Sequence, residues 1–342
     1  MSENTKIEWC DHTFNPWTGC TKISPACDHC YAEGWAKRSG HVGWGVHADR
    51  RRTSNGNWRK PLRWNAEADA FMERHDRRQS VFCASLGDWA DNAVPNEWRF
   101  DLGRLILATP KLDWLLLTKR IGNAACMLRE MFPDGVPPNV RIGATICNQP
   151  EADRDIPKLL ALGLPNLLSM EPLLGPVDLT RIPVSGQGHH EFDPIITANV
   201  LKRAAAYPPL PQVHWVIVGG ESGPGARPMH PDWARSLRDQ CLAAGVPMMF
   251  KQWGEWHTSA FSTRTGEAEF RQFGTHQQWV DKASTWVQDG ICLDRHGVAL
   301  CDGGDMQTAS DEGRFPVTIM HKVGKKTAGR LLDGKEWSEF PA

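Results

Sequence analysis

The sequence predicts an α/β protein built on a full or partial (β/α) TIM-type barrel of six to seven parallel strands, with a C-terminal extension. Short apolar runs alternate along the chain with amphipathic segments of helical period, as repeated strand–helix units do. Several of the runs are continuously apolar, which is typical of buried parallel strands. A doubly wound sheet is the alternative, but no glycine-rich dinucleotide turn follows an early strand.

The elements follow one another in the order that such a barrel requires. A first strand is expected near residues 13–16, and further strands at 81–85, 114–118, 140–145, 166–170, 214–218 and 247–251. Helices are expected between them at 97–108, 123–132, 152–162 and 231–244. The last helix precedes Gly245, a residue type that favours the left-handed conformation at a helix end.

Two segments depart from this alternation and suggest the domain organisation. Residues 180–212 are rich in proline and loop-forming residues, and we expect an insertion there. From residue 255 to residue 342 the pattern becomes irregular. The sequence therefore predicts a barrel over 1–254 and a C-terminal extension, 255–342, that packs on it.

Composition excludes some classes of protein. The chain has 342 residues, of which 41% are hydrophobic and 23% charged, as in soluble globular proteins. A net charge of −1 argues against a uniformly basic coat protein for nucleic acid, although a local basic groove stays possible. No apolar run approaches the roughly 20 residues of a membrane span, and the N-terminus has no signal-peptide core. We expect a cytoplasmic protein with no membrane partner.

Three cysteines lie within eleven residues, at Cys20, Cys27 and Cys30. In a reducing compartment this spacing indicates metal ligation rather than disulfides. Three thiolates in one loop can bind three irons of a cubane cluster and leave the fourth iron open. A zinc site is the alternative and needs a fourth ligand. The candidates for that ligand are Cys10, His12 and His29.

Polar residues follow the predicted strand ends, where the chemistry of a β/α barrel is found. They are Asp88, Asp91, Lys119, Arg120, Asn148, Gln149, Glu171, Glu221, Ser222, Lys251 and Gln252. The alternative is that they only cap helices or complete loops. After the strand at 214–218, Gly219 and Gly220 begin a turn whose backbone can approach a ligand closely.

The segment 47–65 combines basic and aromatic side chains, a pattern of single-stranded or flipped-base nucleic-acid contacts. The candidate contact residues are Arg51, Arg52, Trp58, Arg59 and Lys60. The alternative is a solvated loop that its tryptophans hold against the barrel.

Sequence motifs add a resemblance to a known superfamily. The strings NPWTGC, ending at Cys20, and CDHCYA, beginning at Cys27, resemble the radical S-adenosylmethionine (SAM) proteins, notably the spore photoproduct lyase-like branch. More closely, the chain resembles a phage-associated radical-SAM-like family of unassigned function. The motifs that carry this likeness are IEW at 7–9, LLTKR at 116–120, SMEPLLGP at 169–176, WVIVGGESGPGARP at 215–228, FKQWG at 250–254 and AGRLLDG at 328–334. In one departure from the superfamily, six residues instead of three separate the first two cysteines.

The resemblance implies an enzyme with a [4Fe–4S] cluster on Cys20, Cys27 and Cys30. It implies that SAM chelates the open iron and that an electron, from a donor such as flavodoxin, cleaves it to methionine and a 5′-deoxyadenosyl radical. The expected cofactor-binding residues are Asp88 for the methionine amino group, Lys119 or Arg120 for the carboxylate, Thr145 and Asn148 for ribose or carboxylate, and Gly219 and Gly220 for adenine or substrate. Glu171, Glu221 and Lys251 are the expected catalytic residues.

The resemblance also suggests a substrate. A phage-associated family with a cousin that acts on a thymine photoproduct points to a DNA base, such as a hypermodified thymidine of phage DNA that is rearranged. Two alternatives remain open: a radical enzyme acting on a small molecule or free nucleoside, and a non-enzymatic zinc-stabilised DNA-binding protein.

Overall fold

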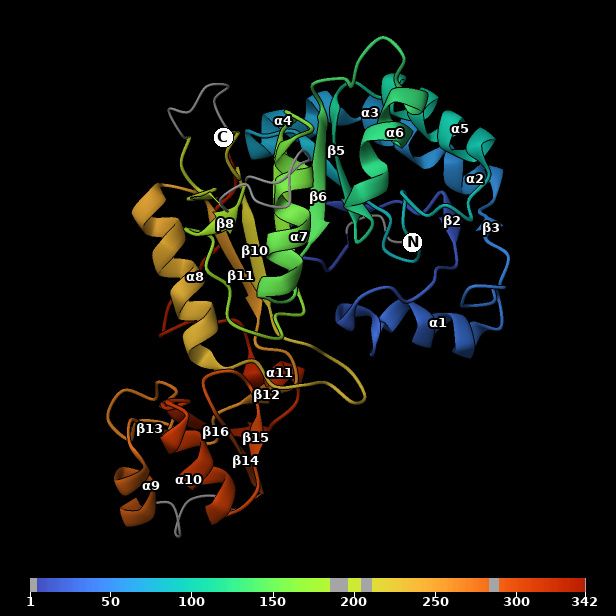
Figure 1. Ribbon diagram of the computed structural model, residues 1–342. Coiled ribbons are helices and arrows are strands. Elements are labelled where there is room, and N and C mark those ends of the chain that lie inside the picture. The colour runs from blue at the N-terminus through green and yellow to red at the C-terminus, as the bar shows by residue number, and fades with distance from the viewer. Residues whose placement is uncertain (1–4, 185–195, 204–210, 283–288, 342) are drawn as a thin grey trace. The chain divides into compact units, whose positions relative to one another are not determined.

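A computed structural model describes residues 5–184, 196–203, 211–282 and 289–341 (Figure 1). The chain divides into two compact units. Unit 1 comprises Met1–Thr145, Arg154–Ser169 and Ala205–His214, and unit 2 comprises Ile146–Asp153, Met170–Ala204 and Trp215–Ala342. Unit 2 thus joins the predicted C-terminal extension with the last two strands of the predicted barrel.

A seven-stranded sheet has the order β1-β4-β5-β6-β7-β10-β11. The strands are β1 His12–Thr13, β4 Gln79–Cys83, β5 Leu112–Thr118, β6 Val140–Thr145, β7 Asn166–Met170, β10 Val216–Gly219 and β11 Met248–Gln252. The pairings of β1 with β4, β4 with β5, β5 with β6, β6 with β7 and β10 with β11 are parallel. The order follows the chain without reversal, as in a β/α barrel and unlike a doubly wound sheet. The prediction of an α/β fold with about seven parallel strands is confirmed.

The strand predictions succeed because these strands are apolar on both faces. Every residue of β7 and of β10 is buried, and in β10 the continuous apolar run marks the strand directly, whereas β7 includes Asn166 and Ser169. The helices that follow are α5 Asn96–Leu107, α6 Ile121–Met131, α7 Gln149–Leu160 and α8 Pro231–Ala244, each within three residues of its predicted start. Helix α8 ends at Gly245 in the left-handed conformation, as expected.

Unit 1 contains four helices that the sequence pattern did not indicate. They are α1 Tyr31–Ser39, α2 Asn55–Trp58, α3 Lys60–Ala66 and α4 Ala68–His75. Three of them have eight residues or fewer, which is too short for a clear helical period. Between α1 and α2, the short strand β3 Arg51–Arg52 pairs antiparallel with β2 Trp17–Thr18. The basic segment is therefore a folded part of unit 1 and not a loop.

The predicted insertion contains a small antiparallel pair, β8 Ile182–Pro183 with β9 Thr197–Ala198. Residues 185–195 and 204–210 of this segment lie outside the described residues. In unit 2, α8 runs beside β10 and β11 (Figure 1). Among the described residues, no helix combines the length and apolar character that a membrane span requires.

The C-terminal segment forms an antiparallel sheet of its own, although its sequence pattern is irregular. The strands are β12 Trp256–His257, β13 Gln272–Phe273, β14 Gly290–Leu293, β15 Ala299–Leu300 and β16 Val317–Lys322, with β16 pairing to β12, β13 and β14. The helices are α9 His276–Lys282, α10 Gly303–Asp311 and α11 Lys325–Ala328. A core that includes Cys292, Met306 and Ile319 holds the sheet against α10. Cys292 therefore has a packing role in this sheet.

Candidate functional site

In unit 1 the three cysteines lie between β2 and α1. A short 3₁₀ helix, Pro25–Cys27, is capped by Ser24, whose hydroxyl accepts a hydrogen bond from the Ala26 amide. Cys27 is buried within this turn, and Cys30 is the residue that precedes α1. The Cys30 amide donates to the Cys27 carbonyl at 3.3 Å, so both residues belong to one tight turn.

The asparagine of the NPWTGC motif fastens this loop to the end of β4. Asn15 is fully buried; its side-chain amide donates to Ser85 Oγ at 2.9 Å, and its Oδ1 accepts from the Leu86 amide at 2.6 Å. The Gly19 amide donates to the Leu86 carbonyl at 3.1 Å, and Gly19 has a φ of +98°. A residue with a side chain would be strained at that angle, which explains the glycine before Cys20.

Two arginines from distant parts of the chain hold the segment Cys20–Thr21. Arg50 donates to Thr21 Oγ1 at 2.8 Å and forms a buried ion pair with Asp91 at 2.7 Å. Arg120 donates to the Thr21 carbonyl at 3.0 Å, and its other terminal nitrogen lies 3.5 Å from Cys20 Sγ. The two arginines therefore hold the Cys20–Thr21 segment, and we call this arrangement the clamp.

Asp88 is buried and its carboxylate is committed to neighbours within unit 1. Oδ1 accepts from Thr118 Oγ1 at 2.6 Å and from the Ala90 amide at 2.9 Å. Oδ2 accepts from the Lys119 amide at 3.1 Å and lies 3.5 Å from the Arg120 guanidinium. Asp88 thus fixes the turn after β5 that carries Lys119 and Arg120. The Lys119 side chain is half-buried and has no carboxylate partner among the residues described.

Soft thiolate ligands bind both zinc and iron–sulfur clusters. Burial raises the pKa of Cys20 to about 11, and the nearby Asp88 carboxylate adds to this while Arg120 opposes it. Within the described residues, no three His, Cys, Asp or Glu side chains are gathered as ligands of a single metal ion. The loop supplies three cysteines, with an N–H donor 3.5 Å from one sulfur.

Thr145, at the end of β6 in unit 1, is buried, and its Oγ1 has no hydrogen-bond partner in the described structure. A buried hydroxyl without a partner is costly, so a ligand group would satisfy it. Asn148 belongs to unit 2, where its Oδ1 accepts from the Glu151 amide at 3.0 Å and so caps the first turn of α7. The capping alternative noted from the sequence describes Asn148 well.

Unit 2 brings together Glu171, Lys251 and Gln252 from the ends of β7 and β11. Lys251 Nζ lies 2.8 and 2.9 Å from the two carboxylate oxygens of Glu171. Gln252 Nε2 donates to Glu171 Oε1 at 2.9 Å, while its buried Oε1 has no partner among the described residues. Glu171 is thus the acid that opposes Lys251.

The glycine-rich turn after β10 also lies in unit 2. A side chain on Gly220 would place its Cβ 1.9 Å from the Trp253 carbonyl oxygen, and one on Gly254 would lie 2.0 Å from the Glu221 carbonyl oxygen. These glycines therefore allow two loops to cross at contact distance, whereas the sequence suggested an approach to a ligand. Gly219 lies against Glu171, with 3.2 Å between the position of a Cβ and Glu171 Cγ. Glu221 is buried and paired with Arg227 at 2.6 Å.

The basic segment presents only part of its charge to solvent. Arg52 pairs with Asp101 at 2.7 Å and stacks on Trp58 at 4.0 Å, and Trp58 packs edge-on against Phe14. Arg51 and Arg59 are exposed and Lys60 is half-exposed. Trp58 therefore packs against neighbouring side chains. This agrees with the alternative in which the tryptophans hold the segment in place.

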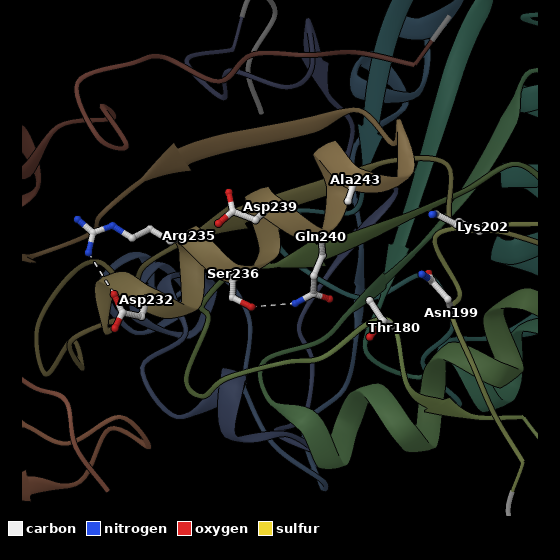
Figure 2. A pocket seen from close by; sticks show the side chains of 9 residues that line it. All are labelled: Thr180, Asn199, Lys202, Asp232, Arg235, Ser236, Asp239, Gln240 and Ala243. Carbon is white, nitrogen blue, oxygen red and sulfur yellow. Dashed lines mark hydrogen bonds and ion pairs between the residues drawn. The ribbon is translucent and has the colours of Figure 1, made fainter. Parts of the chain in front are cut away.

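A pocket of about 570 Å³ lies elsewhere in unit 2, along the outer side of α8 (Figure 2). None of the predicted site residues is among its lining. Two pairs within its wall, Arg235 with Asp232 and Gln240 with Ser236, already engage each other. The lining residues are Thr180, Asn199, Lys202, Asp232, Arg235, Ser236, Asp239, Gln240 and Ala243.

The fold and the two clusters define an α/β protein with a cysteine loop at the strand ends of unit 1 and a Glu–Lys–Gln cluster in unit 2. The chain belongs to the family described as "Protein of unknown function (DUF5131)", whose model matches residues 4–341. No curated protein and no solved structure matches the chain significantly.

Two residues that contribute to these clusters, Arg50 and Thr118, were not singled out from the sequence, whereas Asp91 and Gln252 were noted there only for their position after a strand. Arg50 was one of several basic residues in its segment, and Thr118 was part of a motif. For Thr118 the available signal was its position at the end of a predicted strand.

Proposed function

We propose that the protein is an iron–sulfur enzyme of the radical SAM type, built on a partial β/α barrel of the TIM kind, that modifies a nucleobase. The observation that carries the proposal is the loop of Cys20, Cys27 and Cys30, which Arg50 and Arg120 clamp within unit 1. A loop whose only task is packing has no need for a guanidinium beside a thiol at 3.5 Å. Hydrogen bonds to cluster sulfurs are a means by which proteins adjust such centres.

Cys20, Cys27 and Cys30 would hold the cluster. When bound, the cluster and SAM supply the radical chemistry, and the protein supplies binding and orientation. Lys119, half-buried and without a carboxylate partner among the described residues, is suited to the methionine carboxylate. Asp88 orients Lys119 and Arg120 through its four contacts.

Other residues provide polar contacts for the cofactor or substrate. Thr145 Oγ1 offers a hydrogen bond to a ribose hydroxyl, since it is buried without a partner in the described structure. In unit 2, Glu171 and Lys251, whose charged groups lie 2.8 Å apart, would act on the substrate as hydrogen-bond acceptor and donor. Glu221, held by Arg227 through three hydrogen bonds, would shape the adjoining turn.

A nucleobase in phage DNA is the substrate we favour over a small molecule. The support is the exposed charge of Arg51 and Arg59 in unit 1, which suits phosphate contact. Arg52 and Trp58 would act indirectly, by supporting the surface that carries Arg51.

The test is anaerobic reconstitution with iron and sulfide, followed by metal analysis and a SAM-cleavage assay that measures 5′-deoxyadenosine. We expect about four irons and four sulfides per chain and a brown protein, as for a [4Fe–4S] centre. Cys27→Ala should lose the iron, whereas Cys10→Ala, which removes a buried cysteine outside the loop, should retain it. Stoichiometric zinc without sulfide, or equal loss of metal in both variants, would contradict the proposal.

A second measurement tests the cofactor contact. Lys119→Met should retain the iron but bind SAM about tenfold more weakly, since a charge-assisted hydrogen bond contributes roughly 1.5–3 kcal/mol. Lys111→Met is the matched control, because Lys111 is exposed and pairs with Asp69. Equal SAM affinity in the Lys119→Met variant and the parent would remove Lys119 from the site.

A further inference from the structure

A basic turn lies at the end of the C-terminal sheet in unit 2. Between residues 313 and 332 the chain has five Lys or Arg residues and no Asp or Glu, although its total charge is almost balanced. Three of the five, Lys322, Lys325 and Lys326, are exposed and lie at the end of β16 and in α11. Three like charges within five residues repel one another, so an anionic partner would relieve a cost.

The other two cations of this stretch are already engaged. Arg314 pairs with the fully buried Asp294 at 2.6 Å, and Arg330 donates to Ser338 Oγ at 2.7 Å. For Lys322, Lys325 and Lys326, by contrast, the described residues provide no carboxylate within ion-pair distance. Their charge therefore faces solvent without an internal partner.

Backbone hydrogen bonds tie this turn to the loop that follows β11. The amides of Val323 and Gly324 both donate to the Glu255 carbonyl at 3.0 Å, and the Trp253 amide donates to the Gly329 carbonyl at 3.2 Å. Figure 1 shows α11 beyond the carboxyl ends of β10 and β11. Lys251 and Gln252 directly precede Trp253 in the chain. The three lysines are thus attached to the edge of the sheet that carries the Glu171–Lys251–Gln252 cluster.

A second observation at this edge points to a ligand. Gln252 is 4% exposed, and its Oε1 has no hydrogen-bond partner among the described residues. Buried polar atoms of this kind are satisfied in nearly all proteins, so a donor from a ligand is expected here. The exocyclic amino and ring N–H groups of nucleobases are donors that an amide oxygen recognises.

We propose that Lys322, Lys325 and Lys326 bind the phosphate backbone of a nucleic-acid strand. A nucleoside has no phosphate, whereas a strand presents one phosphate per nucleotide, so three exposed cations on one turn without a carboxylate partner fit a strand. The proposal deepens the proposed function and rests on it for the choice of a nucleobase substrate: the protein acts on a base within a strand rather than on a free nucleoside. It concerns residues outside the segment 47–65.

The test is fluorescence anisotropy with a labelled 20-nucleotide single strand and its duplex, measured over a range of salt concentrations. The triple variant Lys322→Gln, Lys325→Gln, Lys326→Gln should bind at least tenfold more weakly at about 0.1 M salt. Its slope of log affinity against log salt should fall by about three, because each lost phosphate contact removes about one. The control removes three exposed charges of the same unit: Arg264→Gln, Lys282→Gln and Arg295→Gln.

The control variant should bind like the parent, because a change in net charge alone does not remove contacts. A triple lysine variant with the parent's affinity and salt slope overturns the proposal, as does a parent with no measurable affinity for either oligonucleotide. Equal losses in the two variants also overturn it, since the effect is then one of total charge. Iron content of the same samples separates the two proposals: lysine-dependent binding by a protein that cannot hold iron supports the surface and refutes the enzyme.

Discussion

The clamp on the cysteine loop predicts a large loss of stability when Asp91 is replaced by alanine. Asp91 and Arg50 form an ion pair at 2.7 Å whose side chains are 4% and 1% exposed. Removing one partner of a buried pair costs about 3–5 kcal/mol, because the other charge stays buried without compensation. Arg50 keeps three neutral acceptors, Thr21 Oγ1 and the carbonyls of Gly45 and Ala48. We therefore expect the lower end of this range, about 3 kcal/mol.

The assay is equilibrium unfolding in urea, followed by tryptophan fluorescence. The control is Asp69→Ala, which breaks the exposed pair with Lys111 and should cost no more than about 1 kcal/mol. A double variant, Arg50→Met with Asp91→Leu, should recover part of the loss, since it leaves no buried charge. A loss below about 1 kcal/mol for Asp91→Ala would refute the reasoning, because the guanidinium would then be solvated or compensated elsewhere.

Two further predictions concern unit 2. Gly220→Ala should lower the free energy of unfolding by on the order of 3 kcal/mol, because its Cβ would lie 1.9 Å from the Trp253 carbonyl oxygen. Gly303→Ala, whose Cβ would meet nothing within 4 Å, should be nearly neutral when both variants are unfolded in urea. Burial lowers the pKa of His230 from 6.5 to about 4, so the unfolded chain binds the extra proton between these values. The contribution of neutral His230 to the free energy of unfolding should be fully present above pH 6.5 and decrease as the pH drops toward 4. His230→Gln should flatten this dependence of stability on pH. Burial also lowers the pKa of His257 to about 4, so part of the pH dependence should remain in the His230→Gln variant. A slope equal to that of the parent would contradict the prediction for His230.

The parallel sheet could be predicted from the sequence because its strands are buried on both faces. β10 has only buried residues and is a continuous apolar run between loop-forming residues. The short helices α2 and α3 could not be predicted in this way, since four and seven residues do not establish a helical period. Three strands of the C-terminal sheet could not be predicted for a similar reason, because β12, β13 and β15 have only two residues each.

The three cysteines were evident from spacing alone, because Cys20, Cys27 and Cys30 belong to one short stretch and share its local turn. The sequence also placed Asp88 and Lys119 near strand ends.

Which side chains meet at those ends was decided only by the tertiary structure. Arg50 and Asp91 are 41 positions apart, and Arg120 lies 99 positions beyond the Thr21 carbonyl that it binds. Strand and turn propensities depend on neighbouring residues and can be seen in the order of the chain. Packing of the sheet brings distant loops together, and three features depend on it: the ion pairs of the clamp, the crossing of the loops at Gly220 and the attachment of the basic turn to the end of β11. The distances between these loops cannot be deduced from local sequence patterns.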